Sequence, residues 1–226
     1  MICVSVAQST VEGARGLMAS HREADLFEVR LDALNDPAVA PFFPSPKPLI
    51  FTFRAEEEGG FRRFPLEGRL HWLKEAAKQG AAFVDLELAS GPEAISELRA
   101  HLEKTRLILS YHNFHKTPGR DYLRDKVKEM AELGASVGKV VCLVREPREG
   151  LDLLSLILWA RRHLDFPLVA FGMGPAGRWT RAVSLLLGAP FTFAAPYAGA
   201  ETAPGQLAVR DLRQVLDIFK GDRNEA

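Results

Sequence analysis

The chain has 226 residues with 29 basic and 29 acidic side chains, so its formal net charge is zero. This balance gives no electrostatic reason to expect nucleic acid or an anionic membrane as the main partner. The hydrophobic fraction of 47% is ordinary for a globular protein, and the length suits one large α/β domain or two small ones.

The two cysteines, Cys3 and Cys142, lie inside apolar runs, which is typical of buried free thiols. Neither a CxxC pair nor a Cys/His spacing indicates a zinc site. The N-terminal residues MICVSVAQST include no basic leader, and apolar stretches such as LLSLILWA are far shorter than a membrane span. We therefore expect a cytoplasmic protein with no metal and no membrane partner.

Short β-branched or aromatic runs alternate with longer amphipathic segments along the chain. The predicted strands are Ile2–Val6, Leu26–Leu31, Leu49–Arg54, Phe83–Leu88, Leu107–Tyr111, Lys139–Val144, Leu168–Phe171 and Phe191–Ala194. The predicted helices include Leu66–Gln79, Pro92–Lys104, Asp121–Leu133, Gly150–His163, Ala176–Leu187 and Gln206–Phe219. The second connection, Asn35–Pro48, is rich in proline and is predicted to hold only a short helix.

Strands that alternate with helices predict a parallel sheet, because parallel neighbours need crossover connections. Eight such units in a chain of this length match an α/β protein of the (β/α)8 TIM-barrel type. An open doubly wound sheet is the competing fold, but no G-x-G-x-x-G follows the first strand. No linker divides the chain, so we expect a single catalytic domain over residues 1–220 and a frayed polar tail over residues 221–226.

Charged residues fall at the ends of the predicted strands, where buried parallel strands should be apolar. The endings read EVRLD, FTFR, VDLEL and SYHNF. Glu28, Arg30 and Asp32 share one side of their strand, as do Asp85 and Glu87. The carboxyl ends of TIM-barrel strands form the active-site face, so these side chains are predicted to line one pocket. The alternative is a set of buried ion pairs that only fix strand register.

Lys139 is the most informative single residue, because VVCLV follows it and lysine is rarely buried. One interpretation is a strand-end lysine that extends to water. In a pocket with Arg30 and Arg54, desolvation and nearby cations would disfavour the ammonium form. A neutral amine can attack a carbonyl and form a Schiff base.

His112 follows the fifth strand and is expected beside Lys139. Its imidazole can accept a proton and return it near neutral pH. His112 and His115 are three residues apart, as two metal ligands can be, but no third ligand with suitable spacing follows. We therefore predict an acid–base histidine, and no metal.

Taken in this order, the endings EVRLD, FTFR, DLE and SYHNF and the strand lysine resemble type I 3-dehydroquinate dehydratases. GMGPAGRWTR after the seventh strand and ETAPGQLAV after the eighth agree with this resemblance, which runs from Ile2 to Leu216. It implies cofactor-free dehydration of 3-dehydroquinate to 3-dehydroshikimate through a lysine Schiff base. It also implies a place in the shikimate pathway of aromatic amino acid biosynthesis, and a homodimer.

The resemblance implies a role for individual residues. The implied catalytic residues are the Schiff-base lysine Lys139, the general acid/base His112 and Glu58, which orients the histidine. The implied substrate-binding residues are Glu28, Arg30 and Arg54 for hydroxyls, Arg181 for the carboxylate, and Thr202 and Gln206 on a closing loop. The implied supporting residues are Asp32, Asp85, Glu87 and Met173.

The chain departs from the family pattern at three places. Thr202 stands where the family usually has serine, and Phe171 where many members have methionine. Some relatives also begin with a hairpin that closes the bottom of the barrel, whereas this sequence opens on its first strand. The departures retain every reacting group but leave the sealing of the barrel floor open.

Two other functions compete with this resemblance. A class I aldolase is also a Schiff-base TIM barrel, but it commonly needs a glycine-rich phosphate site where this chain carries GMGPAGRWTR and TAPGQ. A catalytically silent barrel that only binds a ligand would not need lysine, histidine and glutamate together. A nucleic-acid role is weaker, because no basic run exceeds two residues.

Overall fold

The computed structural model describes residues 1–220; the predicted tail at 221–226 lies outside the described residues. The strands are β1 (Ile2–Val6), β2 (Leu26–Arg30), β3 (Leu49–Thr52), β4 (Phe83–Glu87), β5 (Arg106–Asn113), β6 (Val137–Leu143), β7 (Leu168–Met173) and β8 (Thr192–Ala194). The α-helices are α1 (Val11–Ser20), α2 (Leu66–Lys78), α3 (Pro92–Arg99), α4 (Arg120–Glu132), α5 (Pro147–Leu164), α6 (Thr180–Leu186) and α7 (Val209–Lys220). Short 3-10 helices are η1 (Ala40–Phe42), η2 (Glu56–Glu58), η3 (Leu88–Ser90) and η4 (Pro175–Gly177).

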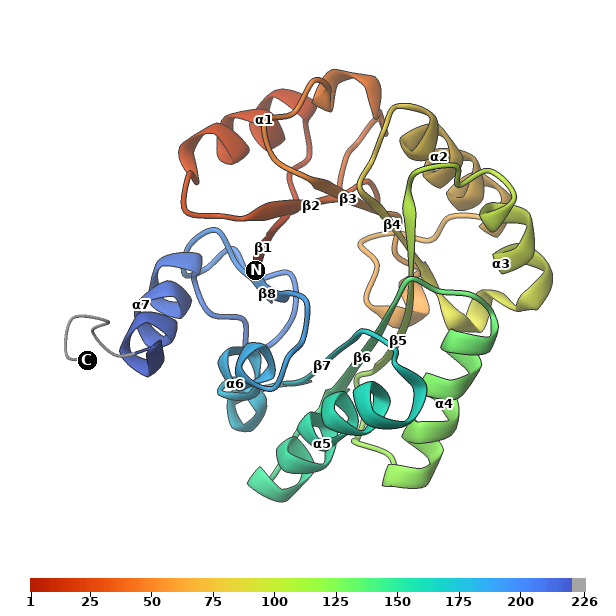
Figure 1. The fold of residues 1–226 in the computed structure, drawn as a ribbon. Helices are drawn as coiled ribbons and strands as arrows, with labels where there is room; N and C mark the ends of the chain where they lie inside the picture. Colours follow the sequence, from red (N-terminus) through yellow and green to blue (C-terminus); the bar gives the residue numbers. More distant parts are fainter. Residues whose placement is uncertain (221–226) are drawn as a thin grey trace.

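The eight strands form one parallel sheet in the order β7-β6-β5-β4-β3-β2-β1-β8, with the helices around it (Figure 1). Because β1 pairs with both β2 and β8, the sheet curls into a nearly closed barrel. Among residues 1–220, no hydrogen-bonded pairing joins β7 to β8, so this seam is where the ring stays open. The predicted (β/α)8 barrel is confirmed.

Element boundaries differ from the predictions mainly at the helices. The predicted helix Pro92–Lys104 ends at Arg99, because the next amides, of His101 and Leu102, bond only three residues back. The helix α5 begins three residues early, at Pro147. There Glu146 and Glu149 form a capping box, and proline lacks the N–H that a first turn leaves unpaired.

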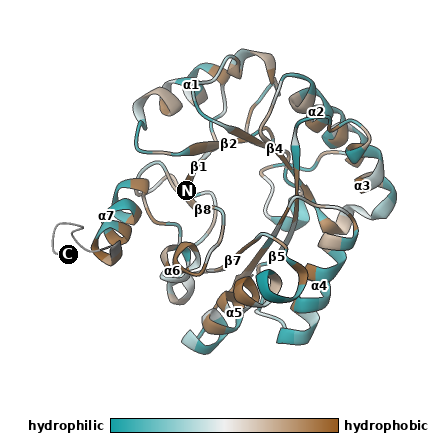
Figure 2. Ribbon diagram, viewed as in Figure 1, coloured by the Kyte–Doolittle hydropathy of each residue, from teal (hydrophilic) through white to brown (hydrophobic). Residues whose placement is uncertain are grey.

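Side chains of the strands alternate between two apolar layers. On β2, Leu26 joins the cluster inside the barrel, while Phe27 and Val29 join the cluster between barrel and helices. Figure 2 shows the same division, with mostly hydrophobic strands and hydrophilic outward sides on helices such as α2 and α4. The inward-facing positions near the carboxyl ends are therefore where polar side chains meet.

The floor of the barrel is sealed from within by aromatic rings. Phe83 and Phe191 meet edge to face with centroids 5.5 Å apart. The Arg106 guanidinium lies 3.9 Å from the centroid of the Phe83 ring, at the amino end of β5. Both rings are buried, so they fill the barrel interior at the amino ends of the strands.

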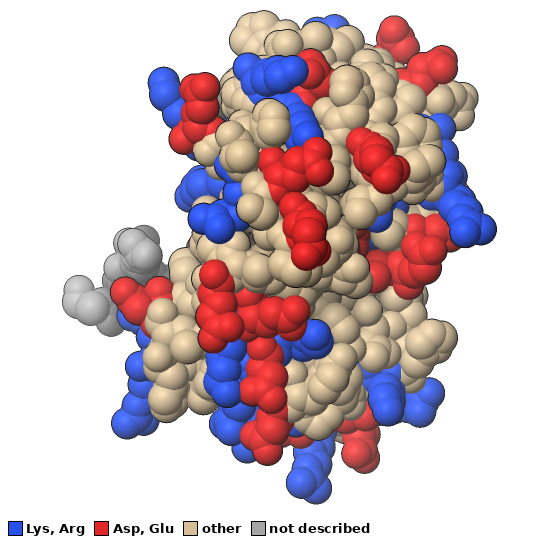
Figure 3. Space-filling model, turned by 90° about the vertical axis from the view of Figure 1, so that its right-hand side faces the viewer, with Lys and Arg blue, Asp and Glu red and all other residues tan. Residues whose placement is uncertain are grey.

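The surface carries charges of both signs. On the face in Figure 3, Lys and Arg side chains lie interspersed with Asp and Glu. Of the helices in residues 1–220, none combines the length and the apolar composition that crossing a membrane requires.

Candidate active site

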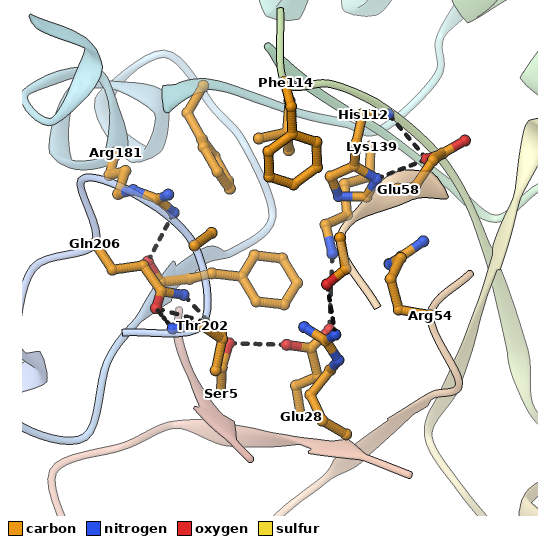
Figure 4. Close-up of a pocket in the computed structure, with 16 residues that line it drawn as sticks. Ser5, Glu28, Arg54, Glu58, His112, Phe114, Lys139, Arg181, Thr202 and Gln206 are labelled. Atoms are coloured by element: carbon orange, nitrogen blue, oxygen red, sulfur yellow. Dashed lines mark hydrogen bonds and ion pairs between the residues drawn. The ribbon is translucent and has the colours of Figure 1, made fainter. Parts of the chain in front are cut away.

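Side chains from the carboxyl ends of the strands converge on a hollow of about 410 Å³, a volume that includes space open to solvent (Figure 4). All the residues assigned to catalysis or substrate binding line it: Glu28, Arg30, Arg54, Glu58, His112, Lys139, Arg181, Thr202 and Gln206. Of the supporting residues, Asp32, Asp85 and Glu87 lie behind the lining and bind it, as described below. Met173 is buried in the apolar cluster inside the barrel.

Lys139 lies on β6 with only 5% of its surface exposed, so it does not extend to bulk water. Its Nζ donates to Asp85 at 2.9 Å, lies 3.7 Å from Glu28 Oε1, and sits 4.0 Å from the centroid of the Phe193 ring. The expectation of neighbouring cations was incomplete, because carboxylates are the charged groups that contact the amine. The lysine is therefore held within reach of a ligand by two acids and an aromatic face.

Arg54 is the centre of a buried ion network. Its guanidinium contacts Asp85 and Glu87 at 2.8 Å each and donates to Ser110 Oγ at 2.7 Å. Burial acts to lower the pKa of Arg54, but these carboxylates raise it above its ordinary value. Burial would likewise raise the pKa of Asp85, yet Arg54 and Lys139 hold it well below the usual range. Both groups therefore stay ionised.

His112 and Glu58 form a second buried pair, contributed by β5 and η2. Glu58 Oε2 accepts the backbone N–H of His112 at 3.0 Å and lies 2.9 Å from its Nδ1. Because this oxygen already accepts one N–H, the geometry fits an Nδ1–H that also donates, which leaves Nε2 unprotonated. Desolvation, with Arg54 and Lys139, places the pKa of His112 well below its ordinary value. Burial raises the pKa of Glu58 to about 8, against the opposing effect of Arg54.

Asp32 links Arg30 by hydrogen bonds to the loop that carries Glu58. It accepts two bonds from the Arg30 guanidinium, at 2.9 and 2.6 Å, and the backbone amides of Arg54 and Phe61 at 3.2 and 3.0 Å. Burial would raise the pKa of Asp32, but the Arg30 bonds lower it. The Arg30 guanidinium also lies over the Phe61 ring. One carboxylate thus fixes both β2 and the segment after β3.

Arg181 differs from every other buried cation of the pocket. It is 1% exposed, and its only hydrogen bond within residues 1–220 is from Nη1 to the Phe193 carbonyl at 3.3 Å. Its Nε and Nη2 have no hydrogen-bond partner in this described part of the chain, and its guanidinium lies 4.2 Å from the centroid of the Phe171 ring. Burial, aided by the charge of Arg178, lowers its pKa to about 9. A carboxylate would satisfy both the charge and the free donors, so Arg181 is suited to bind an anion.

The loop between β8 and α7 covers the same side of the pocket. Gln206 Oε1 accepts the backbone amide of Thr202 at 2.7 Å and its hydroxyl at 3.3 Å. The loop rests closely on the turn after β7, since a Cβ on Gly205 (φ 79°) would lie 2.4 Å from the Gly174 carbonyl oxygen. Only glycine fits there, and the contact sets Thr202 and Gln206 over the hollow.

Several functional residues were missed by the sequence analysis. Ser5 donates to Glu28 at 2.8 Å, Thr52 donates to Glu28 at 2.9 Å, and Ser110 donates to Asp85 at 2.6 Å. Each is a small polar residue that directly follows an apolar run in its strand, which is the signal that could have identified them. Arg69 of α2, which pairs with Glu87, gave a weaker signal as a charge on the apolar side of its helix.

Metal ligation finds no support in the described part of the chain, where no group of three His, Cys, Asp or Glu side chains could hold an ion. His115 is exposed at the surface, whereas His112 lies against Glu58. The side chains that line the hollow instead offer a buried amine, a neutral imidazole and a guanidinium that lacks a carboxylate partner within residues 1–220.

Comparison with known proteins gives consistent matches over nearly the whole chain. The family model for type I 3-dehydroquinase matches residues 2–223. A 3-dehydroquinate dehydratase of Thermococcus gammatolerans is 40% identical over 212 residues, covering 92% of this chain and 95% of the relative. One of Desulfotalea psychrophila is 37% identical over 220 residues, covering 95% and 96%.

Solved structures show the same similarity. The 3-dehydroquinate dehydratase of Geobacillus kaustophilus superposes with a TM-score of 0.89 at 29% identity, covering 99% of this chain and 92% of that one. The type I enzyme of Clostridium difficile, solved with covalently modified comenic acid, gives a TM-score of 0.86 at 26% identity, covering 96% and 91%. The similarity thus extends over nearly the whole fold.

Proposed function

The chain belongs to the type I 3-dehydroquinase family, and from that premise we propose that it dehydrates its substrate through a Schiff base on Lys139. The activity is that of a 3-dehydroquinate dehydratase, a hydro-lyase of the shikimate pathway. One observation carries the covalent step: a buried lysine amine faces the same hollow as a buried guanidinium whose Nε and Nη2 have no partner within residues 1–220.

The substrate is a ring that carries a ketone, a carboxylate and hydroxyl groups. Arg181 binds the carboxylate, because its Nε and Nη2 are free donors in a planar fork. Glu28, Arg30 and Arg54 bind the hydroxyls from the opposite side of the pocket. This placement sets the ketone towards Lys139 and covers the ring with the loop of Thr202 and Gln206.

The covalent step begins with the neutral amine of Lys139. Its Nζ forms a bond to the ketone carbon, and one amine proton passes to the ketone oxygen to give a carbinolamine. The new hydroxyl takes up one further proton from solvent and leaves as water, which gives an iminium ion. The iminium withdraws electrons from the adjacent carbon and makes its C–H more acidic. After loss of the hydroxyl, water hydrolyses the conjugated imine and releases 3-dehydroshikimate and the free lysine.

His112 moves the proton in this scheme. With Nδ1–H directed to Glu58, its Nε2 takes the proton from the activated carbon and then delivers it to the leaving hydroxyl. The low pKa of His112 keeps the imidazole neutral at neutral pH, as a base must be. Such acid–base catalysis typically contributes about 10²–10⁴-fold.

The deciding experiment is intact mass after borohydride reduction, with and without 3-dehydroquinate. We expect a substrate-dependent adduct that maps to Lys139, and no adduct and no turnover from Lys139→Ala. His112→Ala should still form the adduct while turnover falls by about 10²–10⁴-fold. Dehydration without any adduct, or substantial activity in Lys139→Ala, would refute the Schiff base while retaining the substrate.

The same measurement separates the competing functions. An aldolase would form an adduct with a phosphorylated sugar and break a carbon–carbon bond. A silent barrel would be stabilised by 3-dehydroquinate without turnover. Similarity to a 3-hexulose-6-phosphate synthase, at 17% identity and a TM-score of 0.61, extends to the fold alone.

A homodimer and a cytoplasmic location are further proposals that rest on the family resemblance. Sedimentation at several protein concentrations tests the dimer, which a single monomeric species throughout would contradict. Fractionation of the host cells tests the location.

A further inference from the structure

Arg69 is a buried cation on the inner side of a helix. In α2 the buried positions are Arg69, Leu70, Leu73 and Ala76, so the arginine stands in the stripe that packs on the barrel. It is 8% exposed, and its Nη1 contacts Glu87 Oε2. It does not line the pocket, so it reaches the substrate only through other groups.

Arg69 begins a row of alternating charges that ends at the reactive lysine. Glu87 Oε2 contacts Arg69 Nη1, and Glu87 Oε1 accepts a hydrogen bond from Arg54 Nη1 at 2.8 Å. Arg54 Nη2 then contacts Asp85 Oδ2 at 2.8 Å. The same oxygen accepts from Lys139 Nζ at 2.9 Å. Arg54 and Lys139 therefore compete for one carboxylate oxygen.

The charge of this row changes during the proposed reaction. With Lys139 as ammonium, three cations (Arg69, Arg54, Lys139) face three carboxylates (Glu87, Asp85, Glu28), and the row is neutral. Attack on a ketone needs the neutral amine, which leaves one net negative charge. A cation at the far end opposes that excess, and the iminium later restores the balance.

We propose that Arg69 is a positioning residue that sets the pH at which Lys139 becomes reactive. Arg69 neutralises part of the charge of Glu87, so Arg54 interacts more strongly with Asp85. The interaction with Arg54 weakens the attraction of Asp85 for the Lys139 ammonium. Without the Arg69 charge, Arg54 is drawn to Glu87 and Asp85 retains the ammonium more firmly. The inference rests on the Schiff-base function proposed above.

Other titratable groups also act on the row, but none replaces Arg69. Those near its inner end are His112 of β5, Glu58 of η2 and Cys3 of β1. Those beside Arg69 at the surface are Glu56, Glu57 and Arg63, which line a hollow with it. Within residues 1–220, Glu87 forms ion pairs with Arg54 and Arg69 alone. Removal of Arg69 therefore leaves Arg54 as its one remaining cation.

The test follows the pH dependence of imine formation with 3-dehydroquinate, sampled over time and quenched with borohydride at one fixed pH. Arg69→Met should move the midpoint of the rate profile to higher pH by about one unit. Arg69→Lys keeps the charge and should leave the midpoint near that of the wild type. Glu87→Gln removes a carboxylate from the same row and should move the midpoint to lower pH.

The opposite shifts distinguish charge tuning from simple support of the fold. A merely structural Arg69 predicts lower melting temperatures and slower imine formation at every pH, with unchanged midpoints, and that result overturns the inference. If Arg69→Met fails to fold, an unshifted Glu87→Gln profile overturns it equally. Failure of the wild type to form any adduct would instead refute the Schiff-base function, and the inference with it.

Discussion

The two sides of the pocket satisfy their charges in opposite ways. On the side built from β2 to β6, Lys139, Arg54 and Arg30 each contact a carboxylate within 3 Å. On the side built after β7 and β8, Arg181 has no carboxylate partner within residues 1–220, and two of its nitrogens have no hydrogen-bond partner there. The cations of the first side are thus neutralised within the protein, whereas the second side keeps donors for the carboxylate that we propose Arg181 binds.

This division follows the hydrogen bonding of the barrel. Strands β1 to β7 are joined in an unbroken ladder, and β8 joins only through β1. The reacting groups Lys139 and His112 lie in the ladder, where register fixes them. Arg181 lies on α6, and the Thr202 loop is tied to the turn after β7 by the bond from the Gly174 amide to the Pro204 carbonyl at 3.0 Å. The ladder thus holds Lys139 and His112, whereas a helix and a loop hold Arg181 and Thr202.

Replacing the central arginine of each side should change stability in opposite directions. Arg181→Met removes a buried charge without a partner, so the unfolding free energy of the empty protein should rise by about 1–3 kcal/mol. Arg54→Met leaves Asp85 and Glu87 buried without that cation and should lower it by about 3–5 kcal/mol. Urea denaturation measures both, and changes of equal sign would contradict the comparison.

The Arg181 variant should also bind its substrate poorly. Loss of two charge-assisted hydrogen bonds to a carboxylate predicts a rise in KM of about 10²-fold or more. Turnover at saturation should fall less, because the amine and imidazole remain in place. Steady-state kinetics would contradict this if KM stayed unchanged.

For the side of the pocket built from β2 to β6, the sequence predicted where the charged residues lie but not which partners they contact. Alternation along β2 and β4 placed Glu28, Asp85 and Glu87 on the inward side, because side chains in a strand alternate strictly. Which charges touch depends on register, such as Ser110 opposite Lys139 and Asp85 opposite Thr52. Register is set by packing across the whole sheet, so the carboxylates around Lys139 were not foreseen.

The surroundings of Arg181, and the boundaries and packing of the helices, were harder to predict. That Arg181 lacks a partner is a property of its surroundings, which no local pattern encodes. The predicted helix Ala176–Leu187 is divided, since η4 ends at Gly177 and α6 starts only at Thr180. The contact between Arg69 and Glu87 depends on how α2 packs on β4. Such contacts between elements distant in sequence depend on tertiary geometry.

The Glu58–His112 pair, on the side built from β2 to β6, predicts how the unfolding free energy of the protein varies with pH. Burial raises the Glu58 pKa from 4.5 to about 8, so between these values the folded protein holds a proton that the unfolded chain lacks. The unfolding free energy contributed by Glu58 therefore falls as pH rises, by about 1 kcal/mol per unit. His112 has a lowered pKa and acts in the opposite direction, below its ordinary value of 6.5.

The window from pH 6.5 to 8 therefore isolates Glu58. Glu58→Gln keeps the shape and cannot ionise, so its stability should fall less steeply than that of the wild type over this window. Denaturant midpoints at closely spaced pH values give the two slopes. Parallel slopes would mean that Glu58 is already ionised in the folded protein at pH 6.5.

The smallest expected effect concerns Thr202, which lines the pocket on the same side as Arg181. Its amide makes the shorter bond to Gln206, at 2.7 Å, while its hydroxyl makes a longer one at 3.3 Å. The loop geometry thus depends more on backbone than on side chain, and the hydroxyl is the part available to a ligand.

Thr202→Ser keeps that hydroxyl and should leave KM within about twofold of the wild type. Thr202→Val keeps the shape but removes the hydroxyl, so KM should rise about fivefold to tenfold, as for one hydrogen bond of about 1 kcal/mol or slightly more. Equal KM values for the two variants would show that the hydroxyl does not contact the substrate and that Arg181 alone defines the anion side.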